Sequence, residues 1–370
     1  MEKRNLGKTG LELTLMGMGG FHFIETPKKE VELLLNTYLD KGGNYIETAA
    51  DYGDGLSEQK VGLSVAHRRK DFILTSKCMQ RTEEGATESL NRSLKYLKTD
   101  YLDLFFMHAV QSKAEVDQIH SADGAFQAAL AAQKEGKIRF IAISGHGQPD
   151  ALEYAINQAD YDVLMTGFNY YDRFNFPTAE GSLLQTCLKK NMGVLGMKAL
   201  ADGYLFKSFE TAIRYTLSLP IASLVLGANT LEYLEQDLKV INDFKPLSET
   251  EKEALYFKAP ELGDYVCRQC GKCDEENGFK PSELFLLEGI FDRQMDNGKV
   301  ENPESFALRE RLKHWFFQEE IALQKYQKLS PKVNPDKDYS ALNSTCPYGI
   351  DVNKKIKLAH SKLSQKRFIF

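Results

Sequence analysis

Residues 44–62 read NYIETAADYGDGLSEQKVG, and this stretch decides how the rest of the chain is interpreted. Its apolar start, YI, is typical of a short buried strand, which ends in the carboxylate of Glu47. A turn of small residues follows and brings in the phenol of Tyr52, and a glycine-rich loop leads to a helix that starts near Ser57. A carboxylate and a phenol at the end of one strand act together with further groups only if other strands bring those groups to the same place.

Strand-like and helix-like segments alternate from Leu13 to about Ile241. The gap after each strand fits one helix and two loops, which is the βα repeat that requires parallel strands and right-handed crossovers. Eight such strands in order predict an α/β fold that closes as a (β/α)8 TIM barrel, with a doubly wound open sheet as the alternative. The candidate strands begin at Leu13, Asn44, Asp71, Tyr101, Ile138, Tyr161, Gly193 and Ala222.

The composition changes near Lys245–Thr250, where PLSET is a helix-start signal. We therefore expect a barrel over residues 1–250 and a second, cysteine-rich unit with helices over residues 251–370. Residues 274–345 form a charged and aromatic insertion, and its stretch SFALRERLKHWFFQEEIALQKYQKL (305–329) predicts a long amphipathic helix. We favour an insertion that packs on the barrel; the alternative is a lid over its mouth or a face that docks a partner.

Composition and charge exclude several classes of protein. A formal charge of −5 argues against a nucleic-acid-binding domain, and the basic stretch Lys354–Arg367 is interpreted as a solvated helix. The first residues, MEKRNLGKTG, lack the apolar segment of a secretory signal, and no apolar run approaches the ~20 residues of a membrane span. We therefore expect a cytoplasmic protein whose partners are neither nucleic acid nor membrane.

Four polar side chains lie at or just after the ends of consecutive candidate strands: Glu47, Tyr52, Lys77 and His108. In a barrel these strand ends share one mouth, where active sites lie. A phenol with a free pKa of ~10 is a poor acid near neutral pH, but a neighbouring ammonium lowers that pKa and a carboxylate holds the ammonium in place. Each residue alone is more often structural, so the interpretation rests on their shared position. Together they suit protonation of a carbonyl oxygen while a hydride reaches its carbon.

At these residues the sequence resembles the aldo-keto reductase superfamily, over about residues 4–240. The resemblance is carried by NLGKTGLELTLMGMGG, YIETAADYG, LTSK, DYLDLFFMH, EGKIRFIAIS, GVLGMKAL and SLVLGANTLEYLEQDL. It implies a TIM barrel that binds NAD(H) or NADP(H) in extended form, and a catalytic tetrad of the four residues above with Tyr52 as the general acid. The cofactor-binding residues it implies are Gly20, Phe21, Ser144, His146, Met197, Lys198, Ala199, Leu200, Gly203, Gly227, Asn229, Thr230 and Asp237.

Several positions depart from the family pattern. Glu47 stands where the family usually has Asp, and is one methylene longer. Ser144 is kept from the pair that grips the nicotinamide carboxamide, but Gly145 and His146 follow it in place of the usual Asn. Gly167 stands where a Gln is expected, and Met197 stands where an aromatic ring often stacks on the nicotinamide.

The departure near the eighth candidate strand concerns charge. The family usually places a Lys or Arg there to meet the adenosine phosphate, whereas ANTLEYLEQD offers Tyr233 and three acids, Glu232, Glu235 and Asp237. A dianionic 2′-phosphate is poorly compensated by such a surface. This favours NADH over NADPH, or a weakened nucleotide site.

The cysteines point to a second site. CRQCGKC supplies Cys267, Cys270 and Cys273, and CPYGIDV supplies Cys346. A C-x2-C-x2-C triplet wraps one face of a cuboidal cluster and a Cys-Pro supplies a fourth thiolate, which predicts one [4Fe–4S] cluster. Structural zinc is the alternative, but zinc sites with four cysteine ligands prefer two separate pairs of closely spaced cysteines. The set also resembles a branch of aldo-keto reductase-like bacterial oxidoreductases with a C-terminal ferredoxin-type segment, where the Cys-Pro follows the triplet almost at once.

These features predict an NAD(P)H-dependent oxidoreductase that transfers a hydride between nicotinamide and an aldehyde, ketone or sugar-like hydroxyl. One accessory iron–sulfur cluster either ties the tail to the barrel or passes electrons to a redox partner. The alternative is a non-catalytic or electron-transfer barrel subunit that binds nucleotide and serves a partner.

Overall fold

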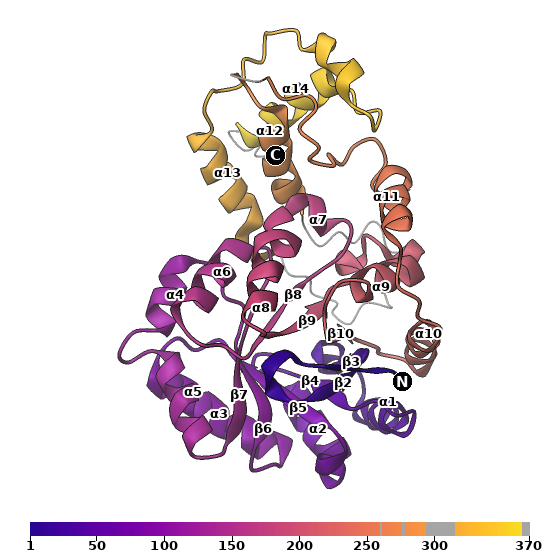
Figure 1. Cartoon of the computed structure of the whole chain (residues 1–370). Coiled ribbons are helices and arrows are strands. Elements are labelled where there is room, and N and C mark those ends of the chain that lie inside the picture. The colour runs from indigo at the N-terminus through magenta and orange to yellow at the C-terminus, as the bar shows by residue number, and fades with distance from the viewer. Residues whose placement is uncertain (260, 276–277, 294–314, 365–370) are drawn as a thin grey trace.

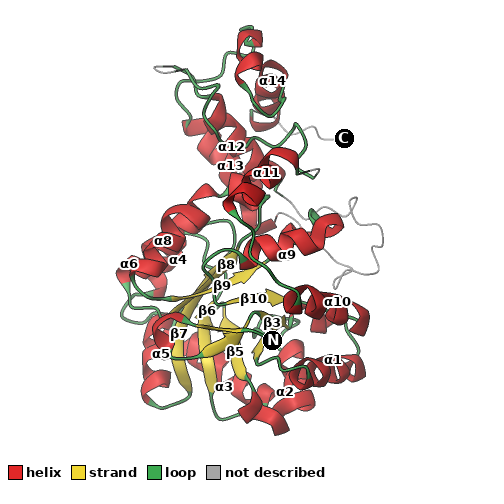
Figure 2. Ribbon diagram, turned by 45° about the vertical axis from the view of Figure 1, so that its right-hand side comes forward, coloured by secondary structure: helices red, strands yellow, loops and turns green. Residues whose placement is uncertain are grey.

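The centre of the molecule is a closed barrel of eight parallel strands in the order β10-β3-β4-β5-β6-β7-β8-β9 (Figures 1 and 2). The structure is a computed structural model that describes residues 1–259, 261–275, 278–293 and 315–364. Because β10 pairs with β3, the barrel has no free edge, so the predicted TIM barrel is confirmed and the open sheet is excluded. The strands are β3 (Met16–Gly19), β4 (Tyr45–Glu47), β5 (Ile73–Cys78), β6 (Leu102–Met107), β7 (Ile138–Gly145), β8 (Val163–Gly167), β9 (Gly193–Met197) and β10 (Ser223–Leu226).

Helices alternate with the strands and surround the barrel (Figure 2). Their buried apolar residues pack against the outward side chains of the strands in one large core. None of the helices in the described part of the chain is both long and apolar enough to cross a membrane. The helices around the barrel are α1 (Lys28–Asp40), α2 (Leu56–Val65), α3 (Glu83–Leu97), α4 (Lys113–Ile119), α5 (Ala125–Lys134), α6 (Pro149–Gln158), α7 (Asp172–Asn175), α8 (Leu184–Lys189), α9 (Phe209–Leu217) and α10 (Leu231–Asn242).

Alternate residues of each strand point into the barrel, and this alternation positions the polar side chains. Tyr45 and Phe106 belong to a buried apolar cluster that fills the interior. Glu47 and His108 follow them by two residues and therefore lie on the same inward side, one layer nearer the mouth. Lys77 occupies the corresponding inward position on β5. The strand ends thus direct these three polar side chains into one mouth.

An N-terminal hairpin closes the opposite end of the barrel. Strands β1 (Lys3–Asn5) and β2 (Glu12–Thr14) pair antiparallel, and Leu6 and Leu13 are fully buried in the interior cluster. The sequence predicts one continuous strand over LTLMGMG from Leu13. This prediction is wrong, because the segment is divided into β2 and β3 (Met16–Gly19). The chain leaves the hairpin after β2 and enters the barrel as β3, because the two parts pair with different partners.

A second group of helices lies beyond the barrel (Figure 1). It begins with α11 (Glu249–Lys258), whose capping box between Ser248 and Glu251 confirms the helix start predicted from PLSET. Helix α12 (Pro281–Asp292) packs against α13 (Gln318–Lys328) and α14 (Val352–Leu363), and also against α7 at the barrel mouth. This second group therefore contacts the barrel at the end where its polar side chains gather.

The helix predicted over residues 305–329 is confirmed over α13, but the residues directly before Gln318 do not continue it. Phe316 and Phe317 have left-handed backbone conformations, with φ of 48° and 57°, and α13 begins only at Gln318. A left-handed residue cannot continue a right-handed helix, so the chain turns at this point. Residues 305–314 lie outside the described residues.

Helix α2 approaches the end of α3 closely at Gly62. A Cβ atom there would lie 2.2 Å from the carbonyl oxygen of Tyr96 and 2.8 Å from the backbone of Leu97. Because backbone atoms cannot rotate away, we expect Gly62→Ala to lower the free energy of unfolding by about 1–3 kcal/mol in urea denaturation. Leu63→Ala, at a half-exposed position of the same helix, is the control. Equal losses in the two variants contradict this account of the packing.

Candidate active site

Three of the predicted tetrad residues are in direct contact. The ammonium of Lys77 forms an ion pair with the carboxylate of Glu47, and it donates hydrogen bonds to the Tyr52 hydroxyl (3.0 Å) and the Thr48 carbonyl oxygen (2.9 Å). The Tyr52 hydroxyl donates to Oε1 of Glu47 at 3.1 Å. Glu47 and Lys77 are both buried. The carboxylate thus fixes a buried ammonium beside the phenol oxygen.

The loop after β3 closes around this contact. The Gly20 amide donates to the carbonyl oxygen of Glu47 at 2.7 Å, and a Cβ on Gly20 would also lie 2.7 Å from that oxygen. The close approach therefore requires glycine at this position. The Phe21 ring packs edge-on against Tyr52, with 5.1 Å between the ring centroids. The structure thus places Gly20 and Phe21 directly beside the tetrad.

His108 joins the group through its ring. Its centroid lies 5.8 Å from that of Tyr52, and its Nδ1 lies 3.5 Å from the carboxylate of Asp51. Burial lowers the pKa of His108 to about 4, although Asp51 opposes this shift. The imidazole is therefore neutral near pH 7 and presents one N–H donor. Sequence reasoning misses Asp51, because an acid in a turn beside a tyrosine carries no distinctive signal.

The protonation of Tyr52 differs from the sequence expectation. Burial raises the pKa of the Tyr52 phenol, whereas the sequence predicts that Lys77 lowers it. Burial also lowers the pKa of Lys77 well below its ordinary value, whereas contact with the Glu47 carboxylate favours the ammonium. The expected lowering is wrong because desolvation penalises the phenolate more than the neighbouring charge assists it. The raised pKa keeps the proton on the phenol until charge develops on an acceptor.

The inward face of β7 continues into a recess beside the tetrad. The hydroxyl of Ser144 and Nδ1 of His146 are buried and have no hydrogen-bond partner among the described residues. His146, Gly167 and Lys198 line a recess with about 310 Å³ of empty space, counting the part open to solvent. Buried polar atoms without partners beside a recess suit a ligand that carries an amide, such as a nicotinamide carboxamide.

The loop after β9 lies at this recess. Met197 ends β9, and Lys198 Nζ lies 2.6 Å from the carboxylate of Asp202. Ala199 is buried, and the Leu200 carbonyl oxygen accepts hydrogen bonds from the Gly203 amide (3.0 Å) and the Leu205 amide (3.1 Å). These bonds fold the predicted cofactor segment into a compact turn.

The remaining predicted cofactor residues follow the neighbouring strand, β10. Gly227 packs so closely against His22 that a Cβ there would lie 2.2 Å from the ring. Asn229 comes next before the helix, and Thr230 caps α10 by accepting a hydrogen bond from the Tyr233 amide at 3.3 Å. Asp237 is partly buried on α10, and burial raises its pKa to about 7. These predicted cofactor residues thus extend from the end of β10 to the middle of α10.

The second group of helices supplies residues that the sequence motifs miss. The Phe316 ring stacks on His146, with centroids 4.1 Å apart and planes within 9°. Gln318 is buried and accepts a hydrogen bond from Gln148 at 3.3 Å. Arg293 is fully buried between two carboxylates of the mouth. No signal marks these residues, because their partners lie far away in the sequence.

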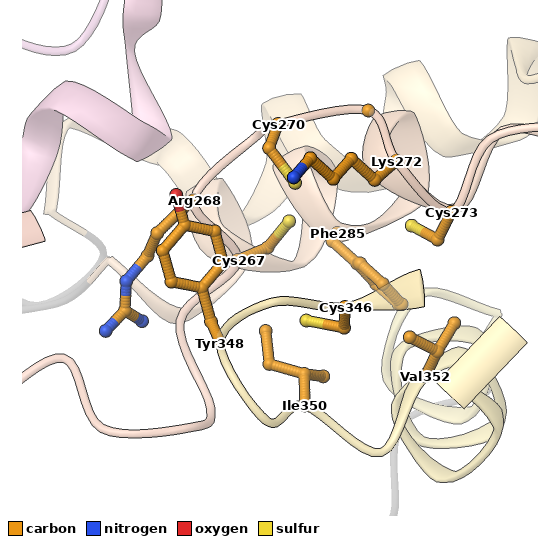
Figure 3. A pocket seen from close by; sticks show the side chains of 11 residues that line it. Cys267, Arg268, Cys270, Lys272, Cys273, Phe285, Cys346, Tyr348, Ile350 and Val352 are labelled. Carbon is orange, nitrogen blue, oxygen red and sulfur yellow. The ribbon is translucent and has the colours of Figure 1, made fainter. Parts of the chain in front are cut away.

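The four cysteines predicted as cluster ligands line one recess outside the barrel (Figure 3). Cys267, Cys270 and Cys273 come from the segment after α11, and Cys346 comes from the loop before α14. The recess has about 320 Å³ of empty space, counting its open side, and Phe285 gives it an apolar wall. Within the described residues, no set of three His, Cys, Asp or Glu side chains is placed to hold a single metal ion.

Comparison with known proteins gives a consistent result for the barrel. A family model described as the aldo/keto reductase family matches residues 15–216. The chain is 26% identical over 305 residues to the uncharacterized oxidoreductase YqkF of Bacillus subtilis, covering 69% of this chain and 95% of that protein. It is 29% identical over 294 residues to L-galactose dehydrogenase of Arabidopsis thaliana, covering 67% of this chain and 90% of that protein.

Solved structures share the same architecture. The holo form of an aldo-keto reductase from Bacillus halodurans aligns with a TM-score of 0.60 and 22% identity. The alignment covers 68% of this chain and 94% of that chain. At this identity the likeness establishes the barrel fold.

The shifted pKa of His108 predicts a pH-dependent stability. The folded pKa is about 4 and the ordinary value is 6.5, so between these values the unfolded chain binds more protons. The contribution of His108 to the free energy of unfolding is therefore fully present above pH 6.5. This contribution falls as the pH drops towards 4, by up to about 3 kcal/mol. In urea unfolding at several pH values, we expect a shallower fall for His108→Gln. His67→Gln, at an exposed position, is the control, and an unchanged slope in His108→Gln contradicts the assignment.

Proposed function

This chain belongs to the aldo/keto reductase family and is an NAD(P)-dependent oxidoreductase, and we propose that it transfers a hydride between nicotinamide and a small aldehyde, ketone or sugar-like hydroxyl. The observation that carries the proposal is the hydrogen bond of 3.0 Å between Lys77 Nζ and the Tyr52 hydroxyl, with Glu47 against the same ammonium. The similarity to an L-galactose dehydrogenase supports the sugar-like end of this substrate range.

In the proposed reduction, Tyr52 is the proton donor to the carbonyl oxygen. The bound nucleotide supplies the hydride. As the phenol gives up its proton, the Lys77 ammonium stabilises the phenolate across the 3.0 Å hydrogen bond. Glu47 keeps Lys77 charged and in place, because an isolated buried ammonium is costly. Neutral His108 donates its N–H to the carbonyl oxygen and orients the substrate beside the phenol.

We assign the nucleotide to the mouth and to the recess beside it. The Ser144 hydroxyl and His146 Nδ1, buried without described partners, suit the carboxamide. The compact turn of residues 198–203 suits the pyrophosphate, and residues 227–237 suit the adenosine end. Because α10 presents acids in place of a cation, a 2′-phosphate is poorly compensated there, and we propose NADH as the preferred nucleotide.

We propose that Cys267, Cys270, Cys273 and Cys346 hold one [4Fe–4S] cluster, and that residues 251–370 form a unit distinct from the barrel of residues 1–250. The shared recess, its apolar wall and the C-x2-C-x2-C spacing with a Cys-Pro support the cluster. All six cysteines are free thiols, which suits the reducing cytoplasm that we propose as its location.

Tyr52→Phe tests the proton donor. It removes one hydroxyl from the contact with Lys77, and we expect kcat for carbonyl reduction to fall by about 10²–10⁴-fold. The Kd for NADH, measured by nicotinamide fluorescence, should stay near the wild-type value because the ring is kept. Tyr154→Phe, whose hydroxyl faces an exposed carboxylate far from the mouth, is the control. Unchanged kcat in Tyr52→Phe, or no turnover by the wild type on any of a panel of carbonyls, contradicts the proposal.

Cys346→Ser tests the cluster. Anaerobically purified wild type should show the broad visible absorption of an iron–sulfur centre and about four irons per chain, as expected for [4Fe–4S]. Cys346→Ser should lose most of this iron, because the fourth ligand comes from a separate loop. Cys187→Ser, at a buried barrel cysteine, should keep it. A wild-type protein that contains zinc and lacks the visible band contradicts the cluster.

A further inference from the structure

Arg293 links the second group of helices to the barrel mouth. It is the residue directly after α12, and its side chain is fully buried. Its guanidinium donates to both carboxylate oxygens of Asp172, at 2.5 and 3.0 Å, and to Asp202 at 3.0 Å. Asp172 begins α7 after β8, and Asp202 lies in the loop after β9. One side chain therefore ties together two loops of the mouth.

The loop that holds Asp202 has an unfavourable backbone. Lys198, Ala201 and Asp202 have φ values of 58°, 49° and 53°, in the left-handed region. Residues with a Cβ avoid this region because that atom crowds the following carbonyl oxygen. Such a loop keeps its shape only where its surroundings hold it. Here the surroundings include the bonds to Asp202 from Lys198 and Arg293.

The charge of Asp202 depends on these two cations. Burial raises the pKa of a carboxyl, but Lys198 and Arg293 outweigh this effect and hold the pKa of Asp202 below its ordinary value. Removing one cation leaves a buried carboxylate with incomplete compensation. The shape of the loop and the charge state of Asp202 thus depend on a residue from outside the barrel.

Helix α12 also reaches the cysteine recess. Phe285 lines that recess and precedes Arg293 by eight residues, about 12 Å along a helix at 1.5 Å per residue. Between them, Glu288 is buried and pairs with Lys355 (2.5 Å) and Lys362 (3.1 Å) of α14. These pairs hold α12 in place, so the helix connects the cysteine recess to the mouth as one rigid element.

We propose that Arg293 is a positioning residue that holds the 198–203 loop in the shape that binds the nucleotide pyrophosphate. The cysteine-rich unit thereby sets the nucleotide affinity of the barrel. This inference rests on the nucleotide site proposed above. Arg293 acts through Asp202: it holds this carboxylate in place and compensates its negative charge beside the proposed phosphate site.

Arg293→Lys tests this role, because lysine keeps the charge but cannot donate in a fork to two carboxylates. We expect the Kd for NADH to rise by about 10-fold, with kcat at saturating NADH changed by less than about 3-fold. Without nucleotide, amide hydrogen exchange over residues 199–205 should be faster in Arg293→Lys than in the wild type. Lys337→Ala removes an exposed ion pair with Glu275 in the same unit and should change neither quantity.

The outcomes separate the two proposals. If Arg293→Lys keeps its iron content and shows wild-type NADH affinity and wild-type exchange in the loop, the positioning role is overturned. If the wild type binds neither NADH nor NADPH, the proposed function fails, and the exchange measurement still decides whether Arg293 holds the loop. If Arg293→Lys does not fold, Asp202→Asn replaces it, since this variant keeps the side-chain shape and removes the charge that Arg293 binds. Wild-type NADH affinity in Asp202→Asn also overturns the role.

Discussion

The pairing of β10 with β3 is the constraint on which the rest of the structure depends. Closing the sheet divides every strand into inward and outward residues, and the inward positions at the mouth fall on Glu47, Lys77 and His108. A buried ammonium is tolerated only with a partner, so the Glu47 carboxylate is required by Lys77. Tyr52 then meets this pair from the loop. Closure of the barrel thereby concentrates polar groups that act on one substrate.

The barrel and the mouth residues were predictable because their signals are local. Strand ends, the βα spacing and the Glu47–Tyr52 segment are each contained within a few residues, and the period of two in a strand fixes which side chains point inward. The protonation of Tyr52 was not predictable, because it depends on how completely the mouth excludes water. The hairpin at the opposite end was missed because β2 and β3 are almost continuous in sequence and differ only in their pairing partners.

The contacts that the second group of helices makes with the barrel mouth could not be predicted from the sequence, for a different reason. Arg293 and Phe316 carry no motif, and they bind Asp202 and His146, which lie 91 and 170 positions earlier in the chain. Their placement depends on α12 being held by α14 through Glu288, a long-range pairing between side chains of ordinary type. The four cysteines were recognisable from their spacing, but their shared recess is a tertiary fact. The molecule thus joins a thiol-lined recess to a barrel mouth through a single helix.

The most direct test of the central claim is an anaerobic titration of the full chain with NADH, and then with NADPH, recording the complete absorption spectrum before and after a carbonyl substrate is added. The account predicts that one NADH binds per chain, more tightly than NADPH. The carbonyl should then oxidise the nicotinamide while the visible band stays unchanged, since two-electron chemistry occurs in the barrel alone. Failure to bind either nucleotide contradicts the account. Bleaching of the visible band as NADH is oxidised without a carbonyl also contradicts it, because the electrons then leave through the cluster.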